Sequence, residues 1–277
     1  KYMKPELDTA GIAGGMLERN KPCFQYEASA KLEKGKLVHL KNGLNFVNVD
    51  SLVINELEEG GNYGAWWYLC MPVSVIKKHD LPFPFFIKTD DIEYGLRTLD
   101  RVIVMNGIGV WHDSFEGKFS YYLEYYIKRN ELVCNAIHEK HTLFLAVKKL
   151  FFGLGKCLAS YNYGSVKYIT RAFDDYLRGT DFFLNTDEEK LNEKLRGNSE
   201  TLLDVNMLNL PNNTKVRKKS KNRRFLRVIT LNGYLIPSRF LKRENKVVPW
   251  ACAHAYDFFG YKNIIEYDAA NDRGAVR

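Results

Sequence analysis

The sequence lacks several features that would place the protein in a special class. It has no run of about 18 consecutive apolar residues and no signal-like apolar segment near Lys1, so it predicts neither a membrane-spanning helix nor a cleaved signal. Its five cysteines are odd in number and widely spread, without a Cys-x-x-Cys pair, which argues against a disulfide framework and a zinc ribbon. No internal repeat is visible. We therefore expect a globular protein of the reducing cytoplasm.

The composition supplies enough apolar material for a substantial core. The 277 residues are 45% hydrophobic and 14% aromatic, which suits one large domain or two ordinary ones. The net charge of +8 favours anionic partners such as nucleotide diphosphates, nucleic acid or a phospholipid surface. Seven of the ten residues 215 to 224 are basic. A solvated loop explains that run as well as anionic lipid or nucleic acid does.

One stretch places two acids directly after apolar residues. Residues 83–87 (Phe-Pro-Phe-Phe-Ile) predict a buried strand, followed by Asp90, Asp91 and a short helix over 91–99. Open α/β sheets bind their ligands at the carboxyl ends of strands. The alternative is an ordinary helix start, in which Asp90 is the N-cap and Glu93 completes a capping box. Taken alone, the pattern is more typical of the capping box.

Aromatic residues and a histidine flank the acid pair. Trp66 and Trp67 follow a glycine turn, and His112 ends a short apolar strand. Adjacent residues on a strand face opposite ways, so we expect one indole in the core and the other at a cleft. An aromatic face suits the apolar C–H surface of a sugar. Upstream, the pair Gly14 and Gly15 indicates either a close approach of another group to the backbone or a turn.

The combined order of these motifs resembles a known enzyme family. Trp-Trp, Phe-Ile-Lys-x-Asp-Asp-x-x-Tyr-Gly-Leu-Arg and Trp-His resemble the catalytic half of the family-2 inverting glycosyltransferases, most closely the bacterial galactofuranosyl-polymerising branch. The resemblance covers residues 10 to 140. It implies a GT-A fold, Asp91 as general base, and His112 completing a Mn²⁺ or Mg²⁺ site with an Asp-x-Asp motif. This chain contains no Asp-x-Asp, so the resemblance implies that the donor-nucleotide half lies before Lys1.

The same resemblance suggests further site residues around the acid pair. Arg129, in a helix predicted over 119–130, either neutralises phosphate or forms a salt bridge on the helix surface. Asp90 and Glu93 bind acceptor hydroxyls or shape the loop, and Lys88 is a nearby charge partner. The expected acceptor-binding residues are Trp66, Trp67, Lys88, Asp90 and Glu93. The isolated His39 is expected to be a surface or packed histidine.

These observations predict an α/β protein in two parts. Residues 1–138 are expected to form the acceptor-side part of a GT-A catalytic domain with a mixed sheet. Residues 139–277 are expected to form a mainly helical extension with a few terminal strands. An amphipathic helix is predicted over 142–158, and strand-like runs are predicted from Phe225 onward, with Asn232-Gly233 as a turn.

The predicted function is a metal-dependent inverting glycosyltransferase of cell-surface polysaccharide synthesis. It would move a sugar, galactofuranose in the branch that it resembles, from a UDP-sugar to a glycan or lipid-linked glycan acceptor, and a homo-oligomer is compatible with this. We expect it in the cytoplasm, with peripheral attachment to the inner face of the plasma membrane. The alternative is a nonenzymatic basic module for nucleic acid or anionic membrane. Because residues 215–224 contain no aromatic side chain, stacking on nucleic acid is disfavoured.

Overall fold

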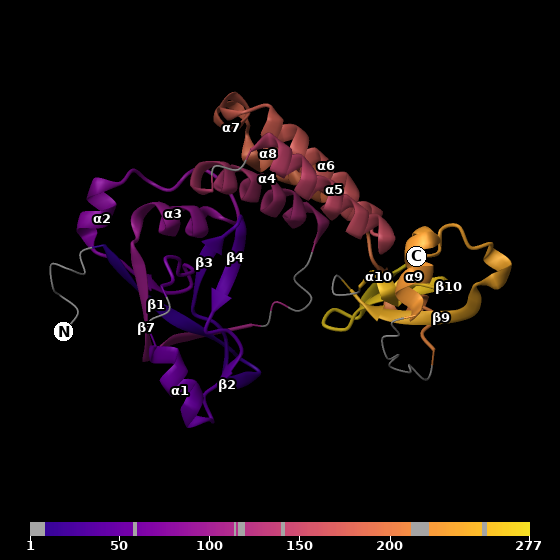
Figure 1. Cartoon of the computed structure of the whole chain (residues 1–277), viewed down its shortest axis with the longest axis horizontal. Helices are drawn as coiled ribbons and strands as arrows, with labels where there is room; N and C mark the ends of the chain where they lie inside the picture. Colours follow the sequence, from indigo (N-terminus) through magenta and orange to yellow (C-terminus); the bar gives the residue numbers. More distant parts are fainter. Residues whose placement is uncertain are drawn as a thin grey trace. The chain divides into compact units, whose positions relative to one another are not determined.

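A computed structural model describes residues 9–57, 60–113, 115, 120–139, 142–211, 222–250 and 254–277. The chain divides into two compact units. The first contains residues 1–114 and 129–143, and the second contains residues 115–128 and 144–277. Figure 1 shows strands and helices mixed in the chain, which confirms the predicted α/β class. The predicted division after residue 138 falls within the second segment of the first unit.

The first unit is built on a mixed five-stranded sheet in the order β5-β2-β1-β6, with β7 on β1. Strand β1 pairs antiparallel with β2 and β6 but parallel with β7. A separate hairpin joins β3 to β4. The strands are β1 (Ala10–Glu18), β2 (Lys21–Glu27), β3 (Ser29–Glu33), β4 (Lys36–Leu40), β5 (Leu44–Asn45), β6 (Leu69–Cys70) and β7 (Arg101–His112). The helices are α1 (Val49–Glu56), α2 (Val73–Lys78), α3 (Asp90–Thr98) and, from Arg129 onward, α4 (Tyr121–His138).

The glycine pair lies inside β1 and not in a turn. A Cβ atom built on Gly15 would lie 2.0 Å from Oε1 of Gln25, and one on Gly14 would lie 2.9 Å from the ring of Tyr68. The expected close approach is therefore confirmed, and the turn is wrong. Small residues at this point leave room for the side chains of Gln25, on β2, and of Tyr68, which directly precedes β6.

Strand β7 forms where the sequence pattern predicts two shorter strands, over 101–105 and 108–111. The sequence predicts a turn at Asn106-Gly107, whereas residues 101–112 form one strand whose register with β1 shifts between Ala13 and Gly15. Gly107 takes a φ of +83°, which absorbs the irregularity without breaking the strand. Beyond it, His112 pairs with Glu18 at the carboxyl ends of both strands.

Residues 83–87 are not a strand. Phe86, Lys88 and Thr89 have φ values of 67°, 68° and 72°, in the left-handed region that an extended strand excludes. The chain is therefore a tight loop that turns Phe85 into the core and then opens α3. Thr89 is the N-cap of α3 without a side-chain capping bond, so the capping box headed by Asp90 does not form either.

The second unit combines helices with a four-stranded sheet in the order β8-β11-β10-β9. The predicted helix over 142–158 is confirmed by α5, but the strand-like run from Phe225 is wrong because these residues form α9. Residues 215–221 of the basic run lie outside the described residues. The helices are α5 (Leu143–Ala159), α6 (Tyr163–Leu177), α7 (Thr180–Asn185), α8 (Glu188–Gly197), α9 (Asn222–Ile229) and α10 (Ala255–Phe258), with short 3₁₀ turns η2 (Val205–Met207), η3 (Leu231–Gly233) and η4 (Ser238–Phe240). The strands are β8 (Leu203–Asp204), β9 (Lys242–Pro249), β10 (Tyr261–Asp268) and β11 (Arg273–Val276).

Polar side chains tie the second unit together. Arg277 forms ion pairs with Glu266 and Glu200 and donates a hydrogen bond of 2.7 Å to the hydroxyl of Tyr121. The sheet is thereby fixed to the amino end of α4. Among the described residues, no helix combines the length and the apolar character that crossing a membrane requires.

Candidate functional site

Asp91 lies in the first turn of α3, directly after the left-handed loop. Its half-buried carboxylate accepts a hydrogen bond of 3.0 Å from the hydroxyl of Tyr63 and one of 2.9 Å from the backbone N–H of Ile92. A carboxylate in the first turn also faces the positive end of the helix dipole. The side chain is therefore held in one orientation from two sides.

Burial raises the pKa of Asp91 above its ordinary value, and the neighbouring charge of Asp90 raises it further. Hydrogen bonds from Tyr63 and from the backbone N–H groups of Ile92 and Trp66 act in the opposite direction, because they stabilise the charged form. The net shift is upward. A carboxylate with a raised pKa is a better proton acceptor than a solvated aspartate.

Tyr63 is a site residue that the sequence motifs did not single out. It is buried, and burial together with the charges of Asp91 and Glu27 raises the pKa of its phenol, which therefore stays protonated and donates to Asp91. Glu27 is also buried and lies 3.0 Å from Nδ1 of His39. That hydrogen bond raises the pKa of His39. His39 is exposed at the surface, as expected, but the hairpin brings it to a buried acid.

The two tryptophans face different ways, as predicted. Trp67 donates from Nε1 to the carbonyl of Gly14 at 3.0 Å and packs against the buried cluster that contains Tyr63. Trp66 is 41% exposed and meets the ring of Tyr94 edge to face at 5.9 Å between centroids. Only Trp66 therefore offers an indole face to a ligand. Its role in acceptor binding stays a prediction.

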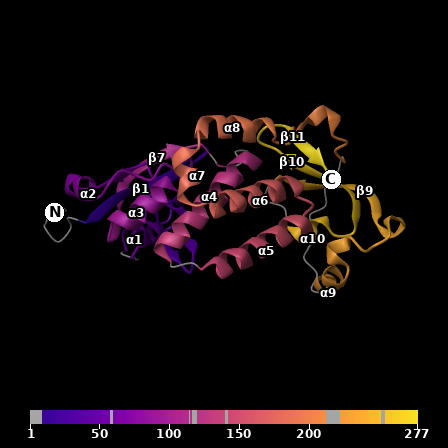
Figure 2. The same cartoon turned by 90° about the horizontal axis from the view of Figure 1, so that it is seen from above.

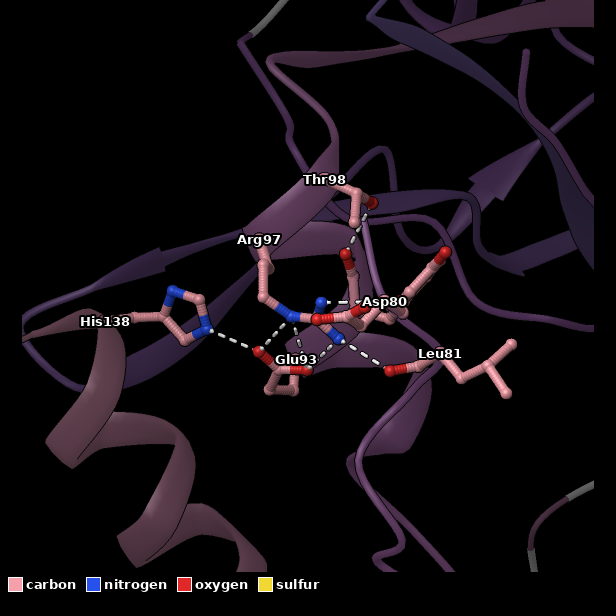
Figure 3. A network of polar contacts seen from close by, with 7 residues as sticks. Asp80, Leu81, Glu93, Arg97, Thr98 and His138 are labelled. Atoms are coloured by element: carbon pink, nitrogen blue, oxygen red, sulfur yellow. Dashed lines mark hydrogen bonds and ion pairs between the residues drawn. The ribbon is translucent and has the colours of Figure 1, made fainter. Parts of the chain in front are cut away.

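Glu93 is fully buried at 0% exposure, which changes the interpretation of this acid. Figure 3 shows its carboxylate between Arg97, with Nε at 3.0 Å, and His138, with Nε2 at 3.2 Å. Arg97 also donates to the backbone carbonyl of Leu81 at 3.2 Å. The geometry therefore supports the loop-shaping alternative for Glu93 and not a contact with acceptor hydroxyls.

The loop before α3 is held from the other side by α4. Asn130 is fully buried, and its side-chain amide donates to the carbonyls of Phe85, Ile87 and Lys88 at 3.3, 3.0 and 2.9 Å. Because of the left-handed turns, the three carbonyl groups converge, and the amide of one side chain can form hydrogen bonds with all of them. Lys88 itself is exposed, so its backbone carries this contact while its side chain remains at the surface.

Arg129 lies on α4, in the region where the sequence predicts a helix, but it is not at the surface. Its guanidinium is fully buried, and it donates to the carbonyl of Phe85 at 3.3 Å and to Oδ1 of Asn130 at 3.1 Å. A fully buried guanidinium does not form a salt bridge on the helix surface, and a phosphate at an open cleft does not reach it. We assign Arg129 to the support of the loop, beside Asn130.

Replacing Asn130 by Ala is expected to destabilise the first unit by about 1–3 kcal/mol, since buried carbonyls lose their donors. The carbonyls concerned precede Asp91, so the loop should also become more accessible to protease. Unfolding in denaturant and limited proteolysis measure the two effects. Asn135→Ala is the matched control, because Asn135 is buried in the same helix but donates to the distant carbonyl of Gly35. If Asn130→Ala leaves the rate of loop cleavage unchanged, the support is not specific.

Comparison with known proteins agrees with part of this interpretation. Galactofuranosyltransferase GlfT2 of Mycobacterium tuberculosis is 30% identical over 138 residues, which are 47% of this chain and 22% of that protein. This likeness supports a glycosyltransferase relationship. The GlfT2 protein of Mycolicibacterium smegmatis is 28% identical over 123 residues, which are 43% of this chain and 19% of that protein.

The extent of the likeness is limited. The chain spans about a fifth of the length of these curated relatives, at 22% and 19%. A scan against protein-family models finds no match. Because the matched part is this small, a transferase activity, a sugar donor and a glycan acceptor stay proposals for this chain. The GT-A fold, the family-2 assignment and the metal stay predictions.

His112 does not complete a metal site with the described residues around it. It is half-buried at the end of β7, where Nδ1 lies 2.6 Å from the backbone carbonyl of Asp113. In the described part of the chain, no group of three His, Cys, Asp or Glu side chains could hold a metal ion. One imidazole alone does not provide the several ligands that Mn²⁺ or Mg²⁺ takes. The described residues therefore do not fit a complete divalent-metal site.

Proposed function

We propose that this chain provides the general base and the acceptor surface of an inverting glycosyltransferase. The observation that carries the proposal is the carboxylate of Asp91, which has a raised pKa, is fixed by Tyr63 and lies in a helix start beside the exposed Trp66. The glycosyltransferase relationship supports the reaction class. The donor is a UDP-sugar, with galactofuranose as the sugar that the relatives' name suggests. The acceptor is a carbohydrate hydroxyl of a cell-surface polysaccharide.

In this mechanism Asp91 accepts the proton of the acceptor hydroxyl. The acceptor oxygen forms a bond to the anomeric carbon as the bond from that carbon to the UDP oxygen breaks. One in-line displacement inverts the anomeric centre, and the nucleotide departs with the bonding electrons. Proton transfer to a positioned base contributes roughly 10² to 10⁴ in rate.

The surroundings of Asp91 suit this task. Tyr63 donates from one side of the carboxylate, at Oδ2, so the base is oriented before the acceptor arrives. Asp90 is half-buried in the same turn and can accept from a second hydroxyl of the sugar. Trp66 presents the exposed ring on which a sugar face can pack. In this proposal His112 would be one ligand of a divalent metal ion, and the metal would stabilise the departing diphosphate as a Lewis acid.

Calorimetry with UDP and Mn²⁺ tests where the donor site lies. We expect the 277-residue chain to bind UDP no more tightly than roughly 1 mM, which corresponds to only about 4 kcal/mol, because His112 does not replace a full set of metal ligands. The substitution His112→Ala should then leave this small heat of UDP binding unchanged. Micromolar binding that is lost in His112→Ala would show that this chain carries the donor site, and the acceptor-side assignment would be wrong.

A further inference from the structure

Helix α5 exposes a row of large aromatic side chains. Phe144, Phe151 and Phe152 are 74%, 71% and 72% exposed, far more than phenylalanine usually is in a folded protein. Residues 144, 148, 151, 155 and 158 follow the alternating spacing of four and three that places side chains on one face of a helix. Within the described part of the chain, nothing lies within 4 Å of a Cβ built on Gly155, so the middle of this face is open there.

A second apolar surface adjoins the carboxyl end of α5. Tyr234 donates from its hydroxyl to the carbonyl of Leu158 at 2.8 Å, and Asn232 donates to the carbonyl of Ala159. These contacts join η3 to the end of α5, and α9 immediately precedes η3; Figure 2 shows α5 and α9 along one side of the second unit. The exposed apolar residues of α9 and its neighbourhood are Phe225, Leu226, Val228, Ile229, Leu231 and Leu235.

Both helices are basic and contain no acid. The sequence of α5 has three lysines and no Asp or Glu, and that of α9 has three arginines and no Asp or Glu. Lys148 and Lys156 are exposed on α5, and Arg224 is exposed on α9. Aromatic side chains beside basic ones match an anionic bilayer, where the rings enter the acyl boundary and the cations meet the headgroups.

A second copy of this chain is a poorer occupant of the same face. A two-fold interface brings identical patches together. The lysines of α5 would then face those of the other copy, with no acid on the helix to pair with them. Like charges across an interface disfavour association. The charge pattern therefore selects an anionic lipid surface over self-association.

We propose that α5 lies flat on an anionic phospholipid membrane, with Phe144, Phe151 and, at the edge of the same face, Phe152 inserted. Lys148 lies between these rings and extends its aliphatic stem so that its ammonium group meets the headgroups, as does that of Lys156. The surface of α9 extends the contact beyond the end of α5. This inference does not rest on the proposed function, because it depends only on the face of the second unit. The proposal assigns the expected membrane attachment to particular side chains. It differs from attachment by charge alone because phenylalanine rings enter the bilayer.

Vesicle flotation of the 277-residue chain tests this contact. We expect binding to phosphatidylglycerol vesicles at low salt and little binding to phosphatidylcholine vesicles. Phe151→Ser with Phe152→Ser should lower the partition coefficient about tenfold or more for each ring removed from the bilayer. Lys148→Glu and Lys156→Glu should each lower it at least about fivefold. The matched control is Leu184→Ser, at a 76% exposed position on α7, which should bind like the wild type.

Circular dichroism and thermal unfolding check that the variants fold, as expected for exposed positions. If the Phe151 and Phe152 variant does not fold, Phe152→Trp gives a second test, because its added indole emission should shift to shorter wavelength with phosphatidylglycerol vesicles. The membrane contact is wrong if the wild type does not float at low salt, if the phenylalanine variant floats as the wild type does, or if the Phe152→Trp emission does not shift. It is also wrong if these variants only convert a dimer into a monomer in sedimentation, which would show that a second copy covers the face.

Discussion

Replacing Asp91 by Asn should lower the rate constant of sugar transfer by roughly 10² to 10⁴, the usual contribution of a positioned general base. Asparagine keeps the size of the side chain and an oxygen that can accept from Tyr63, but it cannot take the acceptor proton. The loss should therefore appear in kcat, with the affinity for the donor nearly unchanged. Initial rates with a UDP-sugar and a glycan acceptor, using the complete natural gene product, measure it. Transfer by the Asp91→Asn protein near the wild-type rate would contradict the assignment.

Substitutions at two neighbouring residues serve as control variants for the Asp91→Asn experiment. Asp90→Asn removes an acid from the same turn and should cost much less, because Asp91 remains. Tyr63→Phe removes the hydrogen bond to Asp91. Since that bond lowers the pKa of Asp91, its loss should move the acid limb of the pH profile of kcat to higher pH. An unchanged acid limb in Tyr63→Phe would mean that Asp91 is not the group that titrates.

The difference in stability between the Asp91→Asn protein and the wild type should also depend on pH in a defined direction. The folded-state pKa of Asp91 is raised, so the protonated form stabilises the fold below the unfolded pKa of about 3.9, and this contribution is lost as pH rises through the folded pKa. Asparagine stays neutral throughout. The variant should therefore unfold at a higher temperature than the wild type at pH 7, and the difference should vanish below roughly pH 4. A variant that is less stable at pH 7 would point to misfolding as the cause of inactivity.

Replacing Arg97 by Ala should cost about 3–5 kcal/mol of stability, because it leaves a fully buried carboxylate without its main partner. Glu93 is 0% exposed, and Arg97 contacts both of its oxygens. Among the described residues, the remaining partner of Glu93 is His138, at 3.2 Å. Denaturant unfolding of the 277-residue chain measures the free energy. A loss below about 1 kcal/mol would match a surface salt bridge and would contradict the buried network.

A double substitution shows whether Arg97→Ala lowers stability because a buried charge is left unpaired or because side-chain packing is lost. Glu93→Met with Arg97→Leu removes both charges and fills most of the space. It should be more stable than Arg97→Ala alone, since no unpaired carboxylate remains. If the changes in unfolding free energy caused by Glu93→Met alone and by Arg97→Leu alone simply add in the double variant, the two charges do not interact. Lys190→Ala is the matched control, because Lys190 pairs with Asp187 at the surface of α8 and should change stability little.

Local sequence patterns predicted the parts of the site that are set by local chemistry. The helix over 91–99 follows from its apolar spacing, and it corresponds to α3. The different exposure of Trp66 and Trp67 agrees with the expectation, but not for the expected reason, because the two residues lie in a turn before β6 and not in a strand. The strand at 83–87 failed because an apolar run does not reveal that Phe86 and Lys88 adopt left-handed conformations.

The remaining features depend on contacts between distant parts of the chain. Asn130 lies more than 40 residues from the loop that it holds, and Glu93 lies 45 residues from His138. Periodicity places Arg129 and Asn130 on a helix but does not say that both are buried. Tyr63 becomes significant only when the fold brings it to Asp91. These side chains look like ordinary surface charges or turn residues in the sequence, since their partners are not sequence neighbours.

The anomeric configuration of the product tests the central claim most directly. The complete natural gene product is incubated with a UDP-sugar and a glycan acceptor, and the product is examined by mass spectrometry and NMR. If Asp91 activates the acceptor hydroxyl for one in-line displacement, the acceptor gains one sugar whose configuration is inverted relative to the donor, and Asp91→Asn forms almost none of it. A product with retained configuration, or hydrolysis of the donor without transfer, would contradict this account.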